Sequence, residues 1–136
     1  MCGITGFATS DSKIGKKQIN KSLDLIKHRG PDDSNYFLDG NIYLGHCRLS
    51  IIDLETGKQP LEDYSGRYII IYNGELYNYI ELKTHLNKKG YKFNTKSDTE
   101  VVLNLFIAYG KGCLEKMNGI FAFSIFDKKT KTFFLA

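Results

Sequence analysis

The second residue of the chain combines two groups that can work together in catalysis. Cys2 is followed by Gly3, and such a small second residue normally permits removal of the initiator Met1. Cys2 then carries a thiol and a free α-amine with a reference pKa of about 8. The amine can take the thiol proton as general base, which leaves a nucleophilic thiolate without any histidine. The alternative is packing, because free cysteine is often a small buried residue.

Six short blocks resemble the motifs of one enzyme family. They are residues 1–7 (MCGITGF), 28–32 (HRGPD), 45–53 (GHCRLSIID), 59–60 (QP), 72–78 (YNGELYN) and 97–100 (SDTE). Taken in this order they resemble the class II glutamine amidotransferases, whose nucleophile is the N-terminal residue. The residues Pro31-Asp32-Asp33 and Arg48-Leu49-Ser50 look like the asparagine synthetase branch of that family.

The resemblance assigns Asn73 and Gly74 to stabilisation of negative charge. An amide under attack develops an oxyanion, which needs hydrogen-bond donors aimed at it beforehand. By the resemblance these are the Asn73 side-chain amide and the Gly74 backbone N–H. A glycine at this point also lets the backbone approach a ligand closely. The alternative is a hairpin turn, which Asn-Gly favours, although the residues that follow do not read as a return strand.

The resemblance also implies a set of glutamine-binding residues. Arg48 can hold the α-carboxylate through its forked donors, and Asp98 can pair with the α-ammonium group, with help from Glu75. The alternatives are a surface salt bridge for Arg48 and a favourable helix-dipole position for Asp98. Further pocket residues are Ile51 and Ile52, through their backbone groups, and Gln59.

The reaction implied by the resemblance is hydrolysis of L-glutamine to L-glutamate and ammonia, without a cofactor. In full-length relatives the ammonia passes to a synthetase domain of the same chain, which uses ATP and magnesium to activate aspartate. The 136 residues hold no glycine-rich phosphate loop. We therefore expect at most a glutaminase here. A non-catalytic module of the same fold, or an amidotransferase with another acceptor, are the alternatives.

Hydrophobic periodicity and turn residues predict the elements that position these groups. We expect strands at 3–8, 35–38, 42–52 and 67–72, helices at 15–27, 76–89 and 97–109, and a closing hairpin of strands 119–126 and 132–135. Turns are expected at 28–33 and around Asp39-Gly40-Asn41, and a loop at 53–66. The second helix has Leu76, Tyr79, Ile80 and Leu86 inward and Gly90 at its end; the third begins with a Ser97–Glu100 capping box.

These elements predict an α+β fold in one domain of residues 1–136. The resemblance implies an αββα sandwich of the N-terminal-nucleophile (Ntn) hydrolase type, with two antiparallel sheets flanked by helices. The apolar strand at the C-terminus suggests that the domain is incomplete, and an exposed sheet edge predicts association with a partner or a homo-oligomer.

Composition excludes several other classes of protein. Hydrophobic residues make up 42% and charged residues 25%, and no apolar run is long enough for a membrane span. The net charge of +4 comes from scattered lysines, which does not indicate nucleic-acid binding. Cys2, Cys47 and Cys113 form no C-x-x-C pair, and the three histidines lack a ligand spacing, so we expect no metal site. The free thiols and the absence of a secretory signal favour the cytoplasm.

Overall fold

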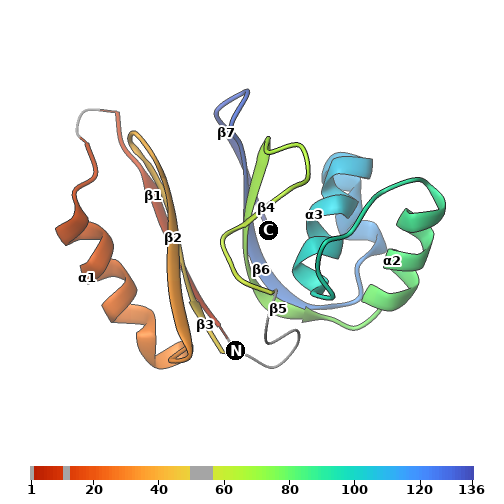
Figure 1. Ribbon diagram of the computed structural model, residues 1–136, viewed down its shortest axis with the longest axis horizontal. Helices are drawn as coiled ribbons and strands as arrows, with labels where there is room; N and C mark the ends of the chain where they lie inside the picture. Colours follow the sequence, from red (N-terminus) through yellow and green to blue (C-terminus); the bar gives the residue numbers. More distant parts are fainter. Residues whose placement is uncertain (1, 11–12, 50–56) are drawn as a thin grey trace.

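Four layers make up the fold, in the order helix, sheet, sheet, helix (Figure 1). The computed structural model describes residues 2–10, 13–49 and 57–136. The strands are β1 (Gly3–Ala8), β2 (Asp33–Asp39), β3 (Ile42–Arg48), β4 (Leu61–Glu62), β5 (Tyr68–Leu76), β6 (Gly119–Asp127) and β7 (Thr132–Leu135). The α-helices are α1 (Lys16–Ile26), α2 (Tyr79–Lys88) and α3 (Asp98–Tyr109), and short 3₁₀ helices span Lys27–Arg29 and Gly110–Lys116. The expected αββα arrangement is confirmed.

Sheet A contains three antiparallel strands in the order β1-β3-β2. Asp39 pairs with Ile42, so the predicted hairpin turn is confirmed, and Gly40 takes its positive φ of 60°. The strand β3 ends at Arg48 and Leu49 lies outside it, so the strand is shorter than predicted. The predicted backbone contacts of Ile51 and Ile52 lie outside the described residues.

The residues of β3 alternate between the two sides of sheet A. Ile42 and Leu44 pack in the cluster between the sheets, whereas Tyr43 packs with Ile19 of α1. The Ser22 and Tyr43 hydroxyls lie 2.8 Å apart, which fixes α1 on this outer side. By the same alternation His46 and Arg48 face sheet B.

Sheet B has the order β4-β5-β6-β7, and several predictions for this part of the chain are wrong. β5 does not end at Asn73-Gly74 but runs on to Leu76, because its pairing with β6 continues through Gly74 opposite Phe121. The helix predicted from Leu76 therefore starts only at Tyr79, and Ile80 is 62% exposed instead of inward. The predicted loop 53–66 also contains the short strand β4.

Gly74 is needed where β5 and β6 approach each other. A Cβ added at this residue would lie 2.5 Å from the Ile120 carbonyl oxygen and 2.7 Å from the Phe121 Cα. Both are main-chain atoms that a side chain cannot displace cheaply. The glycine therefore has a packing reason that is independent of any ligand.

The N-terminus of α3 is capped, but not by the predicted capping box. The Ser97 hydroxyl accepts a hydrogen bond from the Thr99 N–H at 3.1 Å. The Glu100 carboxylate does not return to the Ser97 N–H; it accepts from the backbone N–H groups of Asn94 and Thr95. The segment before α3 thus folds back on the helix. Its backbone N–H groups bind the Glu100 carboxylate, which the sequence spacing predicted to bind the Ser97 N–H.

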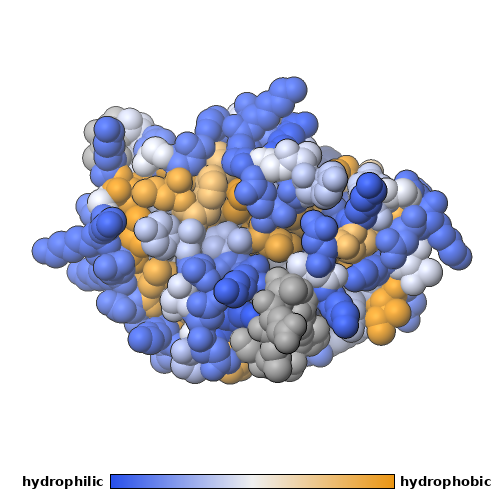
Figure 2. All heavy atoms as spheres, in the orientation of Figure 1, coloured by the Kyte–Doolittle hydropathy of each residue, from blue (hydrophilic) through white to orange (hydrophobic). Residues whose placement is uncertain are grey.

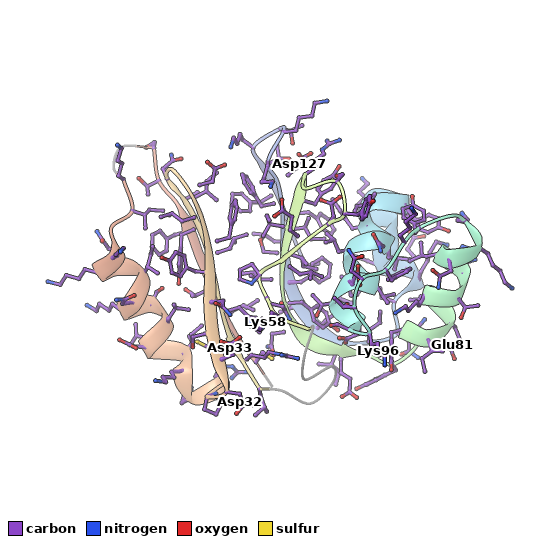
Figure 3. All side chains as sticks on the ribbon, in the orientation of Figure 1. Asp32, Asp33, Lys58, Glu81, Lys96 and Asp127 are labelled. Atoms are coloured by element: carbon purple, nitrogen blue, oxygen red, sulfur yellow. The ribbon has the colours of Figure 1, made fainter. Side chains whose placement is uncertain are left out.

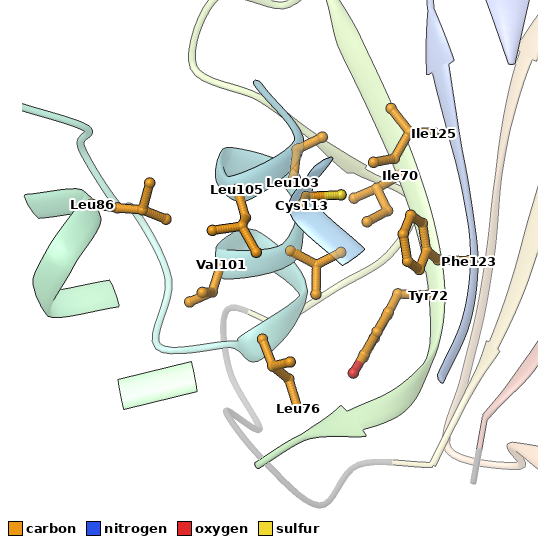
Figure 4. Packing of buried hydrophobic residues seen from close by; sticks show 11 residues of the cluster. Ile70, Tyr72, Leu76, Leu86, Val101, Leu103, Leu105, Cys113, Phe123 and Ile125 are labelled. Atoms are coloured by element: carbon orange, nitrogen blue, oxygen red, sulfur yellow. The ribbon is translucent and has the colours of Figure 1, made fainter. Parts of the chain in front are cut away.

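The main hydrophobic core lies between sheet B and α3 (Figure 4). Its members come from both layers and include Ile70, Val102, Leu105 and Phe123, all nearly inaccessible to solvent. On the face drawn in Figure 2, hydrophobic atoms reach the surface over and between the sheets, and hydrophilic atoms dominate the periphery. Within the described residues, no helix combines the length and the apolar character that crossing a membrane requires.

Candidate active site

A cavity of about 150 Å³ lies where the two sheets meet at the end of the sandwich that carries the N-terminus. Its lining contains Cys2, Arg48, Leu49, Gly57, Gln59, Tyr72, Gly74, Glu75, Tyr77, Ser97, Asp98, Thr99 and Ile120. Figure 3 shows Asp33, Lys58 and Lys96 at this end, and Asp127 at the opposite one. Five of the predicted site residues therefore meet at one place with Cys2: Arg48, Gln59, Gly74, Glu75 and Asp98.

Cys2 is held at both its side chain and its main chain. Its Sγ lies 3.4 Å from the Leu49 nitrogen, which donates to it, and 3.7 Å from the Leu49 carbonyl oxygen. The Arg29 Nε donates to the Cys2 carbonyl oxygen at 3.1 Å. Arg29 reaches Cys2 because Gly30 packs directly on β3, where an added Cβ would lie 2.2 Å from the Cys47 carbonyl oxygen.

Arg48 ends β3 with only 6% of its surface exposed, and it lines the cavity. This burial contradicts the surface position that the alternative interpretation of Arg48 assumed. A buried guanidinium is positioned to bind a planar anion through two parallel N–H donors. The alternation along β3 aims it at sheet B, the side on which Cys2 also lies.

Asp98 occupies the first turn of α3 and is 7% exposed. Its Oδ2 accepts a hydrogen bond from the Leu76 N–H at 3.1 Å, so the carboxylate joins α3 to the end of β5. Burial raises the pKa of the Asp98 carboxyl, and its hydrogen bond with the Leu76 backbone N–H opposes that rise. The carboxylate lines the cavity while it occupies the helix terminus, so the two interpretations of Asp98 are compatible.

The two residues predicted to bind the oxyanion lie on different sides of β5. Gly74 lines the cavity, but Asn73 is not among the lining residues. The continuing strand causes this separation, because successive side chains alternate and Asn73 shares the inter-sheet side with Ile71. The Asn73 Oδ1 is buried and has no hydrogen-bond partner among the described residues.

Gln59 forms part of the cavity wall with both ends of its carboxamide occupied by the protein. Its Oε1 accepts from the Tyr72 N–H at 2.6 Å, and its Nε2 donates to the Thr99 hydroxyl at 3.2 Å. Gln59 thus connects the segment before β4 to both β5 and α3. Such a residue shapes the pocket more than it offers free polar atoms to a ligand.

The whole chain, residues 1–136, matches the model of a family described as "Glutamine amidotransferase domain". The chain belongs to this family. Its relatives include asparagine synthetase [glutamine-hydrolyzing] 3 of Bacillus subtilis, 41% identical over 140 residues, which cover the whole chain and 23% of that protein. Asparagine synthetase [glutamine-hydrolyzing] 1 of the same organism is 47% identical over 135 residues, 94% of the chain and 21% of that protein. The amidotransferase domain thus spans less than a quarter of either relative.

Solved structures support the same fold for the amidotransferase domain. The glutamine phosphoribosylpyrophosphate amidotransferase of B. subtilis, complexed with ADP and GMP, superposes with a TM-score of 0.54 and 31% identity. The match covers 66% of this chain and 22% of that one. The predicted fold class of Ntn amidotransferases is therefore confirmed.

Sequence reasoning gave no role to several residues of the amidotransferase site, among them Leu49, Arg29 and Tyr72. Arg29 lies in the recognised block at residues 28–32, and its bond to the Cys2 carbonyl shows what that block does locally. Tyr72 lines the cavity although it reads as an ordinary aromatic strand residue. No local signal distinguishes Tyr72 from Tyr68 on the same strand, so only the folded structure could identify it.

Proposed function

We propose that the domain hydrolyses L-glutamine to L-glutamate and ammonia, with Cys2 as nucleophile. The observation that carries this proposal is the single cavity that gathers Cys2 from the start of the chain, Arg48 from β3, Gly74 from β5 and Asp98 from α3. A thiol, a cation, a glycine at the cavity wall and a carboxylate match the four parts of glutamine that must be attacked or held.

The first half of the reaction forms a thioester. After Met1 is removed, the Cys2 α-amine takes the thiol proton, and Sγ bonds to the side-chain amide carbon of glutamine. The Leu49 N–H, 3.4 Å from Sγ, is in place to donate to the thiolate. The carbon–nitrogen bond then breaks, and the leaving nitrogen takes the proton held by the amine and departs as ammonia.

The second half restores the enzyme. Water loses a proton to the α-amine as its oxygen bonds to the thioester carbonyl carbon. The carbon–sulfur bond breaks, glutamate leaves, and sulfur regains a proton. In both halves we assign the oxyanion to the Gly74 N–H and the Asn73 amide. Asn73 must turn toward the site for this, and its unpartnered Oδ1 makes reorientation inexpensive.

Arg48 and Asp98 are proposed to bind the two charged groups on the α-carbon of the substrate. Arg48 binds the carboxylate, and Asp98 together with Glu75 binds the ammonium group. Both assigned acids line the cavity with Arg48. This pairing of one buried cation with two carboxylates suits a zwitterion better than a simple amide.

The remaining assignments concern the protein to which this domain belongs. We infer that the ammonia serves asparagine synthesis by a synthetase domain of the same chain, which would use ATP and magnesium; this rests on the names of the relatives. We also infer a cytoplasmic location, because Cys47 and Cys113 are free thiols, as is usual in a reducing compartment.

Two measurements on protein with a verified N-terminal Cys2 test the glutaminase proposal. It should release ammonia from glutamine, and an electrophilic glutamine analogue should label Cys2. The Cys2→Ala variant should lose turnover while it still binds glutamine. Processed, folded protein that neither releases ammonia nor is labelled at Cys2 would defeat the proposal.

A further inference from the structure

The hydroxyl of Tyr72 is buried beside the cavity and has no hydrogen-bond partner among the described residues. Tyr72 is only 2% exposed. A buried polar group without a partner is costly, and a phenylalanine would fill the same space without that cost. The hydroxyl is therefore expected to gain its partner from a ligand.

The position of this hydroxyl is fixed by contacts from three other parts of the chain. The Tyr72 N–H donates to the Gln59 Oε1 at 2.6 Å, and its carbonyl oxygen lies 3.3 Å from the His46 Nε2. Its ring packs against Phe123 at a centroid distance of 6.4 Å. Figure 4 shows the hydroxyl pointing away from Phe123, toward the end of the cluster where Leu76 lies. The group is held in place before any ligand arrives.

The surroundings of the hydroxyl are acidic. Burial first, then the carboxylates of Asp98 and Glu75, and also Cys2, raise the pKa of the Tyr72 phenol, so it stays protonated. A neutral hydroxyl beside a carboxylate can donate its proton to that carboxylate and still offer oxygen lone pairs. This combination accepts a cation, and an ammonium group supplies the N–H donors that fit.

We propose that the Tyr72 hydroxyl binds the α-ammonium group of the substrate together with Asp98, and so selects α-amino amides over amides without the amine. The inference rests on the proposed glutaminase function and adds a specificity-determining residue to it. Tyr72 takes no part in the transfer of protons to or from Cys2.

The test compares glutamine with 4-carbamoylbutanoate, the same molecule without its α-amine. Both Kd values are measured by calorimetry with Cys2→Ala protein, which cannot turn over. Adding Tyr72→Phe should weaken glutamine binding roughly tenfold, the loss of about one hydrogen bond to a charged group. It should leave the Kd of 4-carbamoylbutanoate unchanged. In protein with an intact Cys2, Tyr72→Phe should raise KM for glutamine and leave kcat unchanged.

Tyr43→Phe is the matched control, because it removes a hydroxyl that bonds Ser22 on the outer side of sheet A. It should lower the unfolding midpoint and leave both Kd values unchanged. Tyr72→Phe should instead keep or raise the midpoint, since the hydroxyl that it deletes has no partner among the described residues. A structural role for Tyr72 cannot produce this pairing of unimpaired stability with weakened glutamine binding.

Two results would overturn the inference: an unchanged glutamine Kd in the Tyr72→Phe variant, or equal weakening of both ligands. If the parent protein still releases ammonia in either case, only the role of Tyr72 falls. If the Cys2→Ala parent binds no glutamine and the intact protein releases no ammonia, the proposed function falls as well.

Discussion

Lowering the pH from 7 to 5 is expected to destabilise the fold through one buried imidazole. His46 is 1% exposed between the sheets, and its Nε2 lies 3.3 Å from the Tyr72 carbonyl oxygen. A carbonyl only accepts, so Nε2 carries the proton. Burial first, and the charge of Arg48 as well, lower the pKa of His46 from 6.5 to about 4, against the opposing effect of the Tyr72 hydrogen bond.

The sign and size of the effect follow from proton linkage. Below pH 6.5 the unfolded chain binds a proton at His46 that the folded protein does not bind. The free energy of unfolding therefore decreases as the pH is lowered, until the pH lies below the pKa of His46 in the folded protein. A difference of this size in pKa corresponds to about 3 kcal/mol in total. About 2 kcal/mol of it should be lost between pH 7 and pH 5.

Urea unfolding at pH 7, 6 and 5 measures this loss. His46→Gln keeps an N–H donor for the Tyr72 carbonyl but cannot titrate. Between pH 7 and pH 5, its free energy of unfolding should therefore fall by about 2 kcal/mol less than that of the parent protein. The carboxyl groups of Asp63, Asp98 and Asp127 titrate in both proteins, so their contributions to the pH dependence cancel when the variant is compared with the parent. Equal pH dependence of the two proteins would refute the assignment of His46 as a buried neutral residue.

Two further predictions concern β5 and the substrate. Gly74→Ala should destabilise the protein by about 2 kcal/mol or more in urea unfolding, because its Cβ would meet the Ile120 carbonyl oxygen at 2.5 Å. Unchanged stability would contradict this steric conflict between β5 and β6. Arg48→Ala should raise KM for glutamine far more than it lowers kcat, and Arg48→Lys should restore little, because lysine lacks the forked donors. Steady-state ammonia release measures both constants, and an unchanged KM would contradict the carboxylate role.

Local patterns predicted the helices and hairpins that depend on short-range signals. The turn at Gly40 and the spacing of apolar residues in α1 are encoded within a few residues. The point at which β5 ends is not determined by local signals. Leu76 suits a helix or a strand, and its pairing with Gly119, more than forty residues later, decides for the strand.

That misplaced boundary also explains what could not be predicted at the site. A strand ending at Asn73-Gly74 would bring both residues to the cavity, whereas a continuing strand separates them by alternation. Cys2, Arg48 and Asp98 were identified because their motifs are specific. The role proposed for the Tyr72 hydroxyl depends on Asp98 and the other residues that surround it only in the folded domain.

The most direct test isolates the nitrogen of Cys2 from its sulfur. Two proteins are compared that differ only at the N-terminus: one begins at Cys2, and the other retains a residue before it, as verified by mass spectrometry. Both keep the thiol, and the same glutamine Kd would show that both keep the pocket. We expect ammonia release from the first and none from the second, whose nitrogen is an amide. Equal turnover by the two proteins would contradict the α-amine as the general base.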